Sequence, residues 1–274
     1  MDLQSDNPDR WPALIATTLS SFLTPLALST VNIALPSIGK EFSANALTLS
    51  WIATAYILSA AIFLLPFGRA ADIYGRKKVF ICGTLIFTAS SFFMGTSSSA
   101  QLLILFRAVQ GVGGAMIFGT GIAILTSVFP VGERGRVLGI NVAAVYLGIS
   151  VGPFIGGVLT EHIGWRSIFF LNLPFGIIIA IFSMWKLKGE WAEAKGEAFD
   201  LAGSLIYSIM LLAIMYGFSL LPQRLSILLI TAGALGICGF VFWEARAKKP
   251  ILDIRLFKSN RAFTLSNVAA LINY

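Results

Sequence analysis

Long stretches without a charged residue are the feature that most limits how this chain can fold. Runs free of Asp, Glu, Lys and Arg cover residues 11–39, 42–68, 137–160, 167–185, 201–223, 225–243 and 262–274. One further run, 79–132, contains a single charge at Arg107, and the small polar residues 96–99 divide it in two. Since a helix needs roughly 20 consecutive apolar residues to cross a bilayer, these runs predict eight complete spanning helices and the start of a ninth.

Composition favours a membrane protein over a soluble one. Charged residues make up 12% of the chain and hydrophobic residues 57%, whereas soluble domains carry about 25% charged residues. In lipid every backbone polar group must bond internally, so runs of this length are helices rather than strands. The first run is too long for a cleavable signal peptide, and its flank is acidic, with Asp2, Asp6 and Asp9. We therefore expect an all-α polytopic membrane protein.

Lys and Arg are distributed unequally between the two faces of the predicted membrane domain. Sixteen fall on the face that receives the N-terminus and the loops after the second, fourth, sixth and eighth helices, and three fall on the other face. By the positive-inside rule, this asymmetry predicts a cytoplasmic N-terminus in a multi-pass protein of the cytoplasmic membrane. The basic pI of about 9.6 is thus a topology signal, and we expect no nucleic-acid partner.

One short pattern occurs twice. The first copy consists of Gly68, Asp72, Gly75 and Arg76. The second copy has the same spacing, with one extra residue before the arginine, and consists of Gly157, Glu161, Gly164 and Arg166. Three predicted helices separate the copies, so the two lie on opposite faces of the membrane. Weak internal similarity with inverted topology is typical of secondary transporters, and it predicts two three-helix repeats within a six-helix bundle.

Several stretches resemble the major facilitator superfamily, and within it the 14-helix drug:proton antiporters of the EmrB/QacA type. Residues 68–78 resemble motif A of the superfamily, 107–114 motif B and 148–157 motif C, while 30–36 and 164–176 resemble stretches typical of the 14-helix branch. The resemblance implies the N-terminal portion of such a transporter. It places the N-terminal six-helix transport bundle at 1–186, a linker helix pair at 187–243, and a cytoplasmic loop with the start of the C-terminal bundle at 244–274.

The loop after the second helix contains the first candidate site, which consists of Gly68, Asp72, Gly75 and Arg76. Both glycines permit close backbone approach and positive φ, which would hold the Asp72 carboxylate against a neighbouring helix end. The resemblance implies that this contact acts as a latch in alternating access. The alternative, which applies most to Lys77 and Lys78, is that the basic residues only keep the loop in the cytosol.

The fifth helix contains a stripe of small residues at four-residue spacing. We include Gly148, Gly152, Pro153, Gly156 and Gly157 in this candidate site. Such a stripe lets another backbone approach closely in a membrane, and proline bends the helix. The functional hypothesis is a seal between the two halves of an antiporter, and the alternative is generic tight packing.

Arg107 is the one charge inside a complete predicted span, where arginine is costly. The functional hypothesis places its side chain in the bundle interior near Gln110 and Asn32, where it would tune a proton or substrate site. The alternative is that the side chain snorkels to the membrane surface. Tyr56 and Asn141 complete the set of polar residues that we expect in a mostly apolar substrate cavity.

These features predict a secondary active transporter that exports hydrophobic or amphipathic compounds across the lipid bilayer. Its partners would be small amphipathic substrates and, in a full-length form, protons. All 13 acids fall outside the deep part of the spans, and Ala27 stands where the resembling branch commonly has Asp. Two rivals stay open, a carrier for one metabolite and a non-transporting scaffold or inactive half-transporter. We expect no catalytic residues, no metal site and no cofactor, so the chain is not expected to be an enzyme.

Overall fold

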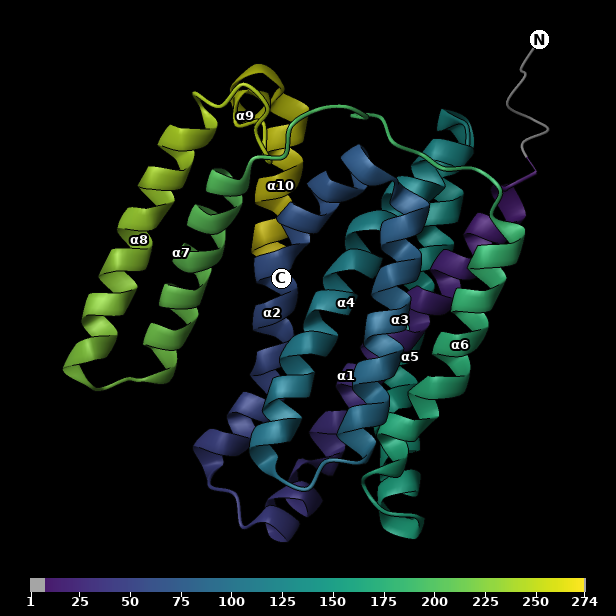
Figure 1. Cartoon of the computed structure of the whole chain (residues 1–274), viewed down its shortest axis with the longest axis vertical. Coiled ribbons are helices and arrows are strands. Elements are labelled where there is room, and N and C mark those ends of the chain that lie inside the picture. Colours follow the sequence, from purple (N-terminus) through teal and green to yellow (C-terminus); the bar gives the residue numbers. More distant parts are fainter. Residues whose placement is uncertain (1–7, 274) are drawn as a thin grey trace. The chain divides into compact units, whose positions relative to one another are not determined.

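Helices make up most of the chain in the computed structural model, which describes residues 8–273 (Figure 1). Eight of them are long and apolar enough to cross a membrane, and the described residues contain no β-strand. The prediction of an all-α polytopic fold is therefore confirmed. The helices are α1 (Arg10–Phe42), α2 (Ala46–Tyr74), α3 (Arg76–Gly95), α4 (Ala100–Val128), α5 (Val131–His162), α6 (Ser167–Lys186), α7 (Leu201–Ser219), α8 (Arg224–Glu244), α9 (Arg255–Ser259) and α10 (Arg261–Asn273).

The chain divides into two compact units, Met1–Lys195 and Gly196–Tyr274. The first contains α1–α6 and the segment 187–195, and the second contains α7–α10. Assignment of 187–243 as a linker pair, and of 244–274 as the start of another bundle, remains a prediction.

The helix contacts within the first unit have an internal symmetry. Helix α1 packs on α5 and α6, while α4 packs on α2 and α3. If α1–α3 are exchanged with α4–α6 in order, the α1–α5 pair becomes the α4–α2 pair, and the α1–α6 pair becomes the α4–α3 pair. This is the contact pattern that two three-helix repeats of inverted topology produce.

The two turns that the sequence repeat aligns share a positive backbone φ. Gly75 joins α2 to α3 with a φ of 117°, and Gly164 joins α5 to α6 with a φ of 108°. Side chains rarely adopt this region, so glycine is required at both turns. The turns lie at opposite ends of the unit, because three helices separate them.

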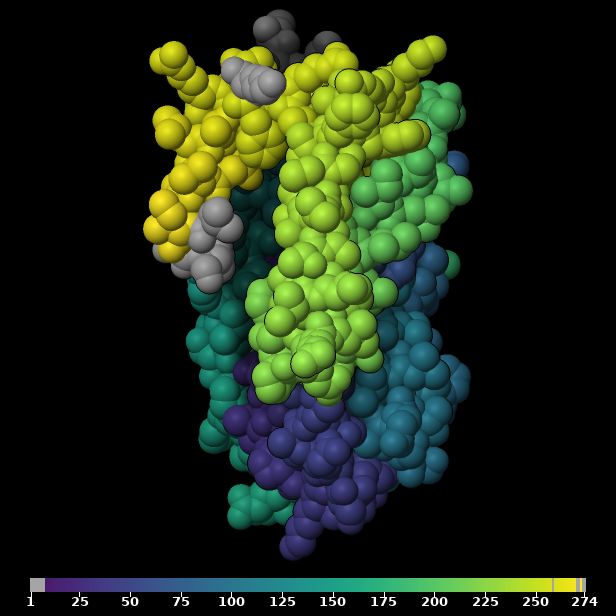
Figure 2. Space-filling model, turned by 90° about the vertical axis from the view of Figure 1, so that its left-hand side faces the viewer, coloured from purple at the N-terminus to yellow at the C-terminus, as the bar shows by residue number. Residues whose placement is uncertain are grey.

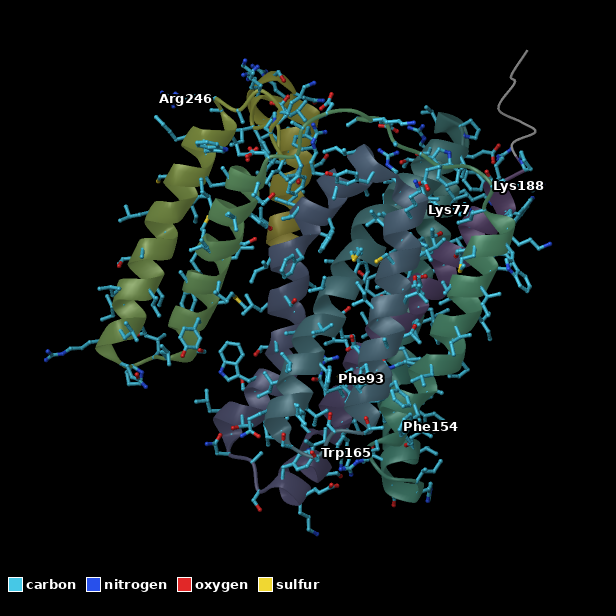
Figure 3. All side chains as sticks on the ribbon, viewed as in Figure 1. Lys77, Phe93, Phe154, Trp165, Lys188 and Arg246 are labelled. Atoms are coloured by element: carbon cyan, nitrogen blue, oxygen red, sulfur yellow. The ribbon has the colours of Figure 1, made fainter. Side chains whose placement is uncertain are left out.

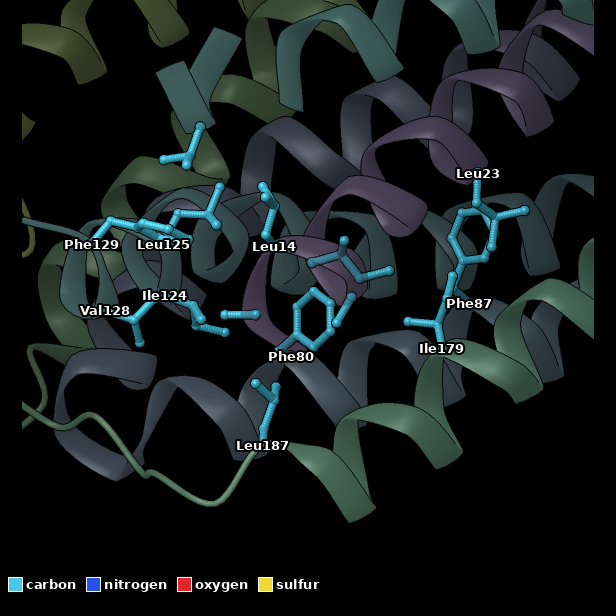
Figure 4. Close-up of a cluster of buried hydrophobic side chains, with 14 of the residues drawn as sticks. Leu14, Leu23, Phe80, Phe87, Ile124, Leu125, Val128, Phe129, Ile179 and Leu187 are labelled. Atoms are coloured by element: carbon cyan, nitrogen blue, oxygen red, sulfur yellow. The ribbon is translucent and has the colours of Figure 1, made fainter. Parts of the chain in front are cut away.

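Buried apolar side chains hold the first unit together in two main clusters. One combines residues of α1, α3, α4 and α6, among them Leu23, Phe80, Phe87, Ile124 and Ile179 (Figure 4). The other lies around Ile38, Ile52, Leu103, Trp165 and Phe169. Because lipid is as apolar as these side chains, close packing rather than exclusion of water is the main source of stability here.

In the second unit, α7 and α8 form an antiparallel pair. Glycines permit their contact, since a Cβ on Gly217 would lie 2.8 Å from the Ile230 side chain and one on Gly236 3.2 Å from Met210. Figure 2 shows α8 in yellow-green along its length, and much of its exposed surface is apolar, as at Leu228 and Leu235. An exposed apolar surface on a helix of this length fits a membrane-embedded pair.

Candidate functional site

Arg76 is the centre of a charged cluster at the α2–α3 turn. Its Nε donates to Asp72 Oδ1 at 2.9 Å, its Nη1 donates to Ser127 Oγ at 2.6 Å, and Nη1 also lies 2.7 Å from Glu193 Oε1. Only 8% of the Arg76 side chain is exposed. One guanidinium therefore links α2, α4 and the segment that follows α6.

The segment 187–195 also binds the turn through the backbone. Arg76 N donates to Trp191 O at 2.8 Å, and Ala194 N donates to Asp72 O at 2.9 Å. Lys77 N donates to Glu190 Oε1 at 2.9 Å. The start of the segment also contacts the N-terminal end of α1, because Lys188 N donates to Oδ1 of Asp9, the residue before α1, at 2.7 Å. We define the clasp as this segment together with Asp72, Gly75, Arg76 and Lys77.

Four expectations about this loop can now be compared with the structure. Gly75 has the expected positive φ, and a Cβ there would collide with the Glu190 carboxylate. Gly68 lacks the expected positive φ, and a Cβ there would meet nothing within 4 Å, but its backbone does lie 3.5 Å from the Cβ position of Gly119 on α4. Asp72 accepts from the side chain of Arg76, the first residue of α3. We expected the carboxylate to bind the backbone of a helix end, and no side chain caps the N-terminus of α3. Lys78 is exposed, which agrees with the alternative that this residue only keeps the loop in the cytosol.

Arg107 lies in a second polar network, inside the bundle, and is fully buried. Its Nε donates to Ile52 O at 3.1 Å, its Nη1 donates to Gln110 Oε1 at 2.7 Å, and its guanidinium carbon lies 4.7 Å from the centroid of the Tyr56 ring. Gln110 Nε2 in turn donates to Ser91 Oγ at 2.9 Å. The snorkelling alternative is therefore wrong.

This network has spare hydrogen-bonding capacity. Arg107 Nη2 and Tyr56 Oη are buried without a hydrogen-bond partner among the described residues. Such groups are costly unless something bonds them. These two atoms can therefore bond a further polar group.

The other two cavity candidates are Asn32 and Asn141. Asn32 is exposed, and Arg107 donates to Ile52 and Gln110 instead, so the proximity of Asn32 to Arg107 stays a prediction. Asn141 is buried on α5, where its Oδ1 accepts from Ser21 Oγ at 2.9 Å. The structure thus unites Tyr56, Gln110 and Arg107 in one network, whereas Asn141 bonds to α1.

The small-residue stripe of α5 packs against α1. A Cβ on Gly152 would lie 2.5 Å from Ser29 Cβ, one on Gly156 would lie 3.0 Å from Thr30 Cα, and one on Gly148 would collide with Phe22 O. These three glycines contact a helix of the same unit, which is the tight packing of the alternative, and a seal between two transporter halves stays a prediction. Pro153 is exposed, and a Cβ on Gly157 would meet nothing within 4 Å.

A second charged cluster, which the sequence analysis missed, lies at the other end of the first unit. Arg166 Nη1 donates to Glu41 Oε2 at 2.9 Å, and Trp165 Nε1 donates to the same oxygen at 2.6 Å. Arg166 Nη2 donates to Ser97 O at 3.1 Å. Figure 3 shows Trp165 at the end of the bundle opposite to Lys77 and Lys188. The aligned positions of Arg76 and Arg166 in the sequence repeat were the signal that could have indicated this cluster.

Comparison with known proteins identifies the fold that holds these clusters. Residues 17–272 match the Major Facilitator Superfamily. The chain belongs to this superfamily. Its members are membrane transporters rather than enzymes, so the expectation of a multi-pass transporter fold is confirmed at that level.

Three comparisons illustrate the relationship. The chain is 32% identical over 265 residues to the riboflavin transporter RibZ of Clostridioides difficile (strain 630), covering 97% of this chain and 58% of that protein. It is 33% identical over 251 residues to the multidrug resistance protein Stp of Mycobacterium tuberculosis (strain CDC 1551 / Oshkosh), covering 89% and 47%. The crystal structure of the human organic anion transporter MFSD10 (TETRAN) aligns with a TM-score of 0.62 at 17% identity, covering 81% and 60%. The chain spans about half the length of the curated relatives that it matches.

Proposed function

We propose that this chain forms the N-terminal portion of a secondary active transporter that exports hydrophobic or amphipathic compounds. The observation that carries the proposal is the pair of three-helix repeats with a charged cluster at each end, around Arg76 and around Arg166. Alternating access requires contacts that hold one end of a bundle in one conformation and release it in the other. Ionic contacts near the surface suit this task, since each contributes only modestly to stability.

Relatives support the substrate class. The multidrug resistance protein Stp is among the similar proteins, and so is the tetracenomycin C resistance and export protein of Streptomyces glaucescens. We extend their function to this chain as a proposal, together with membership of the 14-helix drug:proton antiporter branch. Its buried apolar residues outnumber the buried polar ones, as bulky amphipathic ligands favour.

A carrier for a single metabolite is the second candidate. The observation that favours it is the similarity to the riboflavin transporter RibZ. Transport of puromycin and of riboflavin by cells that produce the protein separates the two candidates. Export of puromycin supports the first, and transport of riboflavin alone supports the second.

Proton coupling is a further part of the proposal. Ala27 is buried on α1, with 2% exposure, where the resembling branch commonly has Asp. Glu244 is buried at the last residue of α8, with 2% exposure, and every described acid within α1–α8 lies at most two residues from a helix end. We propose that α1–α8 supply no membrane-embedded proton carrier, and that the coupling acid of a proton-driven form lies outside them.

Orientation completes the proposal. We place the end of the first unit that contains Lys77 and Lys188 in the cytoplasm, with the N-terminus, because basic residues concentrate there. The test is a cysteine at position 78 in a background that lacks Cys82 and Cys238. A membrane-impermeant thiol reagent should label it in everted vesicles and leave it unlabelled in intact cells, and the reverse pattern would refute the orientation.

A further inference from the structure

A cavity of about 340 Å³ opens where α1 and α5 begin. Arg10, Glu133 and Arg136 line it on the polar side, and Trp11, Leu14 and Ile140 are among the apolar residues that line it. Arg10 forms an ion pair with Glu133, and the Arg10 guanidinium carbon lies 4.9 Å from the centroid of the Phe129 ring. The cavity thus has a charged entrance and an apolar wall.

A second cavity, of about 280 Å³, adjoins the first along α1 and α5. Leu14 and Ile140 line both cavities, and the second adds Ile15, Thr18 and Leu19. From Arg10 to Leu19 the helix rises about 14 Å, at roughly 1.5 Å per residue. We define the α1–α5 groove as these two cavities together. It is polar at one end and apolar along the rest of its length.

The charge at the entrance favours an anion. Two guanidiniums face one carboxylate, and since Arg10 is paired with Glu133, the side chain of Arg136 supplies the excess positive charge. The nearby Asp9 carboxylate accepts from the backbone N–H groups of Lys188 and Gly189. The N-termini of α1 and α5, which begin at Arg10 and Val131, add the positive ends of two helix dipoles.

The depth of the groove matches a lipid. Its charged end lies where two spanning helices begin, which is the level of the phospholipid headgroups. Trp11, with 71% exposure, lies at the same level, and tryptophan is enriched at the membrane interface. The apolar end runs into the span, where an acyl chain lies.

We propose that the α1–α5 groove binds one anionic phospholipid, with the phosphate at Arg136 and Arg10 and an acyl chain along Leu14, Ile15 and Ile140. This inference depends on the membrane fold and not on the proposed substrates. The lipid would fill the space between the first turns of α1 and α5, and its phosphate would bridge Arg10 of α1 and Arg136 of α5.

The test is native mass spectrometry of the purified chain in an equimolar mixture of phosphatidylglycerol and phosphatidylcholine. The wild-type chain should retain phosphatidylglycerol preferentially. Arg136→Gln should reduce this preference about fivefold, the change expected for one basic residue at an anionic membrane surface. Arg134→Gln is the matched control, since Arg134 Nε donates to Phe129 O at 3.1 Å and the residue does not line the cavity. Equal losses in the two variants would show diffuse attraction and overturn the site.

Two tryptophan substitutions test the apolar part of the α1–α5 groove. Ile140→Trp should fill the groove and lower lipid retention, while Val142→Trp, at a residue with 50% exposure that does not line either cavity, should leave it unchanged. Glycerol 3-phosphate, which has the headgroup charge without acyl chains, should not displace the lipid. Displacement by that compound, or unchanged retention in Ile140→Trp, would refute a lipid site. Size-exclusion profiles of all variants check that they fold.

Discussion

The Arg76 guanidinium lies 2.7 Å from the Glu193 carboxylate, 117 positions further along the chain. The same guanidinium binds Asp72, four positions earlier. Only 8% of the arginine side chain is exposed, whereas Glu193 is 70% exposed. Arg76 can therefore lose its contact with the exposed Glu193 at little cost while it keeps its contact with Asp72. The Arg76–Glu193 contact is thus the one suited to opening and closing.

Asp72→Asn should reduce export several-fold while expression and membrane insertion stay normal. The reason is that the substitution removes the charge that holds Arg76 within the clasp and leaves the shape of the side chain. Dye efflux from cells that produce equal amounts of protein measures the effect. Lys78→Gln, at an exposed residue of the same turn, is the control and should export normally. Wild-type export by Asp72→Asn would remove the case for a gating role.

Two glycines of the α2–α3 region should respond differently to substitution by alanine. Gly75→Ala places a side chain at a φ of 117° and against Glu190, and strained backbone of this kind costs about 1–3 kcal/mol. Gly68→Ala enters open space and should leave stability nearly unchanged. Thermal unfolding of the purified variants in detergent compares them. If the two midpoints fall equally, the turn does not require glycine at position 75.

Substitution in the α5 stripe should damage the contact with α1. Gly152→Val forces a branched side chain against Ser29, and overpacking of this kind costs about 1–3 kcal/mol. Gly157→Val, on the same helix but with nothing within 4 Å of its Cβ position, should retain stability. Gly119→Val should fall between them, since its nearest neighbour lies 3.5 Å away. Thermal unfolding and export both report the difference, and equal tolerance at positions 152 and 157 would contradict tight α1–α5 packing.

The 274-residue chain alone should not couple export to protons. Its described acids include none deep in a span, and Arg107 stays charged at accessible pH. Reconstitution in liposomes with an imposed pH gradient tests this expectation. Substrate accumulation driven by the gradient would contradict it. Ala27→Asp in the complete transporter should strengthen coupling, because a carboxylate in apolar surroundings can bind and release a proton near neutral pH.

The helices were predictable because hydropathy alone determines them. The turn between α3 and α4 was predictable as well, since the Ser99 side chain accepts from Leu102 N at 3.3 Å as an N-cap. The burial of Arg107 was open at the sequence level, because α4 is apolar on all sides and no face of it is marked as interior. The clasp could not be predicted, because Glu190 and Glu193 look like solvated loop residues until the fold brings them to Arg76.

Inverted symmetry was predictable only in part. The repeat correctly aligned Gly75 with Gly164, whose turns share a positive φ. It also aligned Asp72 with Glu161, but Arg166 pairs with Glu41 of α1 instead. Acid positions can change between repeats because a charged pair needs only a nearby carboxylate, whereas a positive φ is fixed to one residue of the turn.

Substrate accumulation in everted membrane vesicles tests the central claim most directly. The protein is produced in cells that lack their own efflux pumps, and uptake of puromycin and of riboflavin is followed after energisation. We predict that puromycin accumulates in wild-type vesicles, and that this accumulation falls several-fold with Asp72→Asn and is unchanged with Lys78→Gln. Riboflavin uptake without any puromycin uptake, or uptake that Asp72→Asn leaves unaltered, would contradict it.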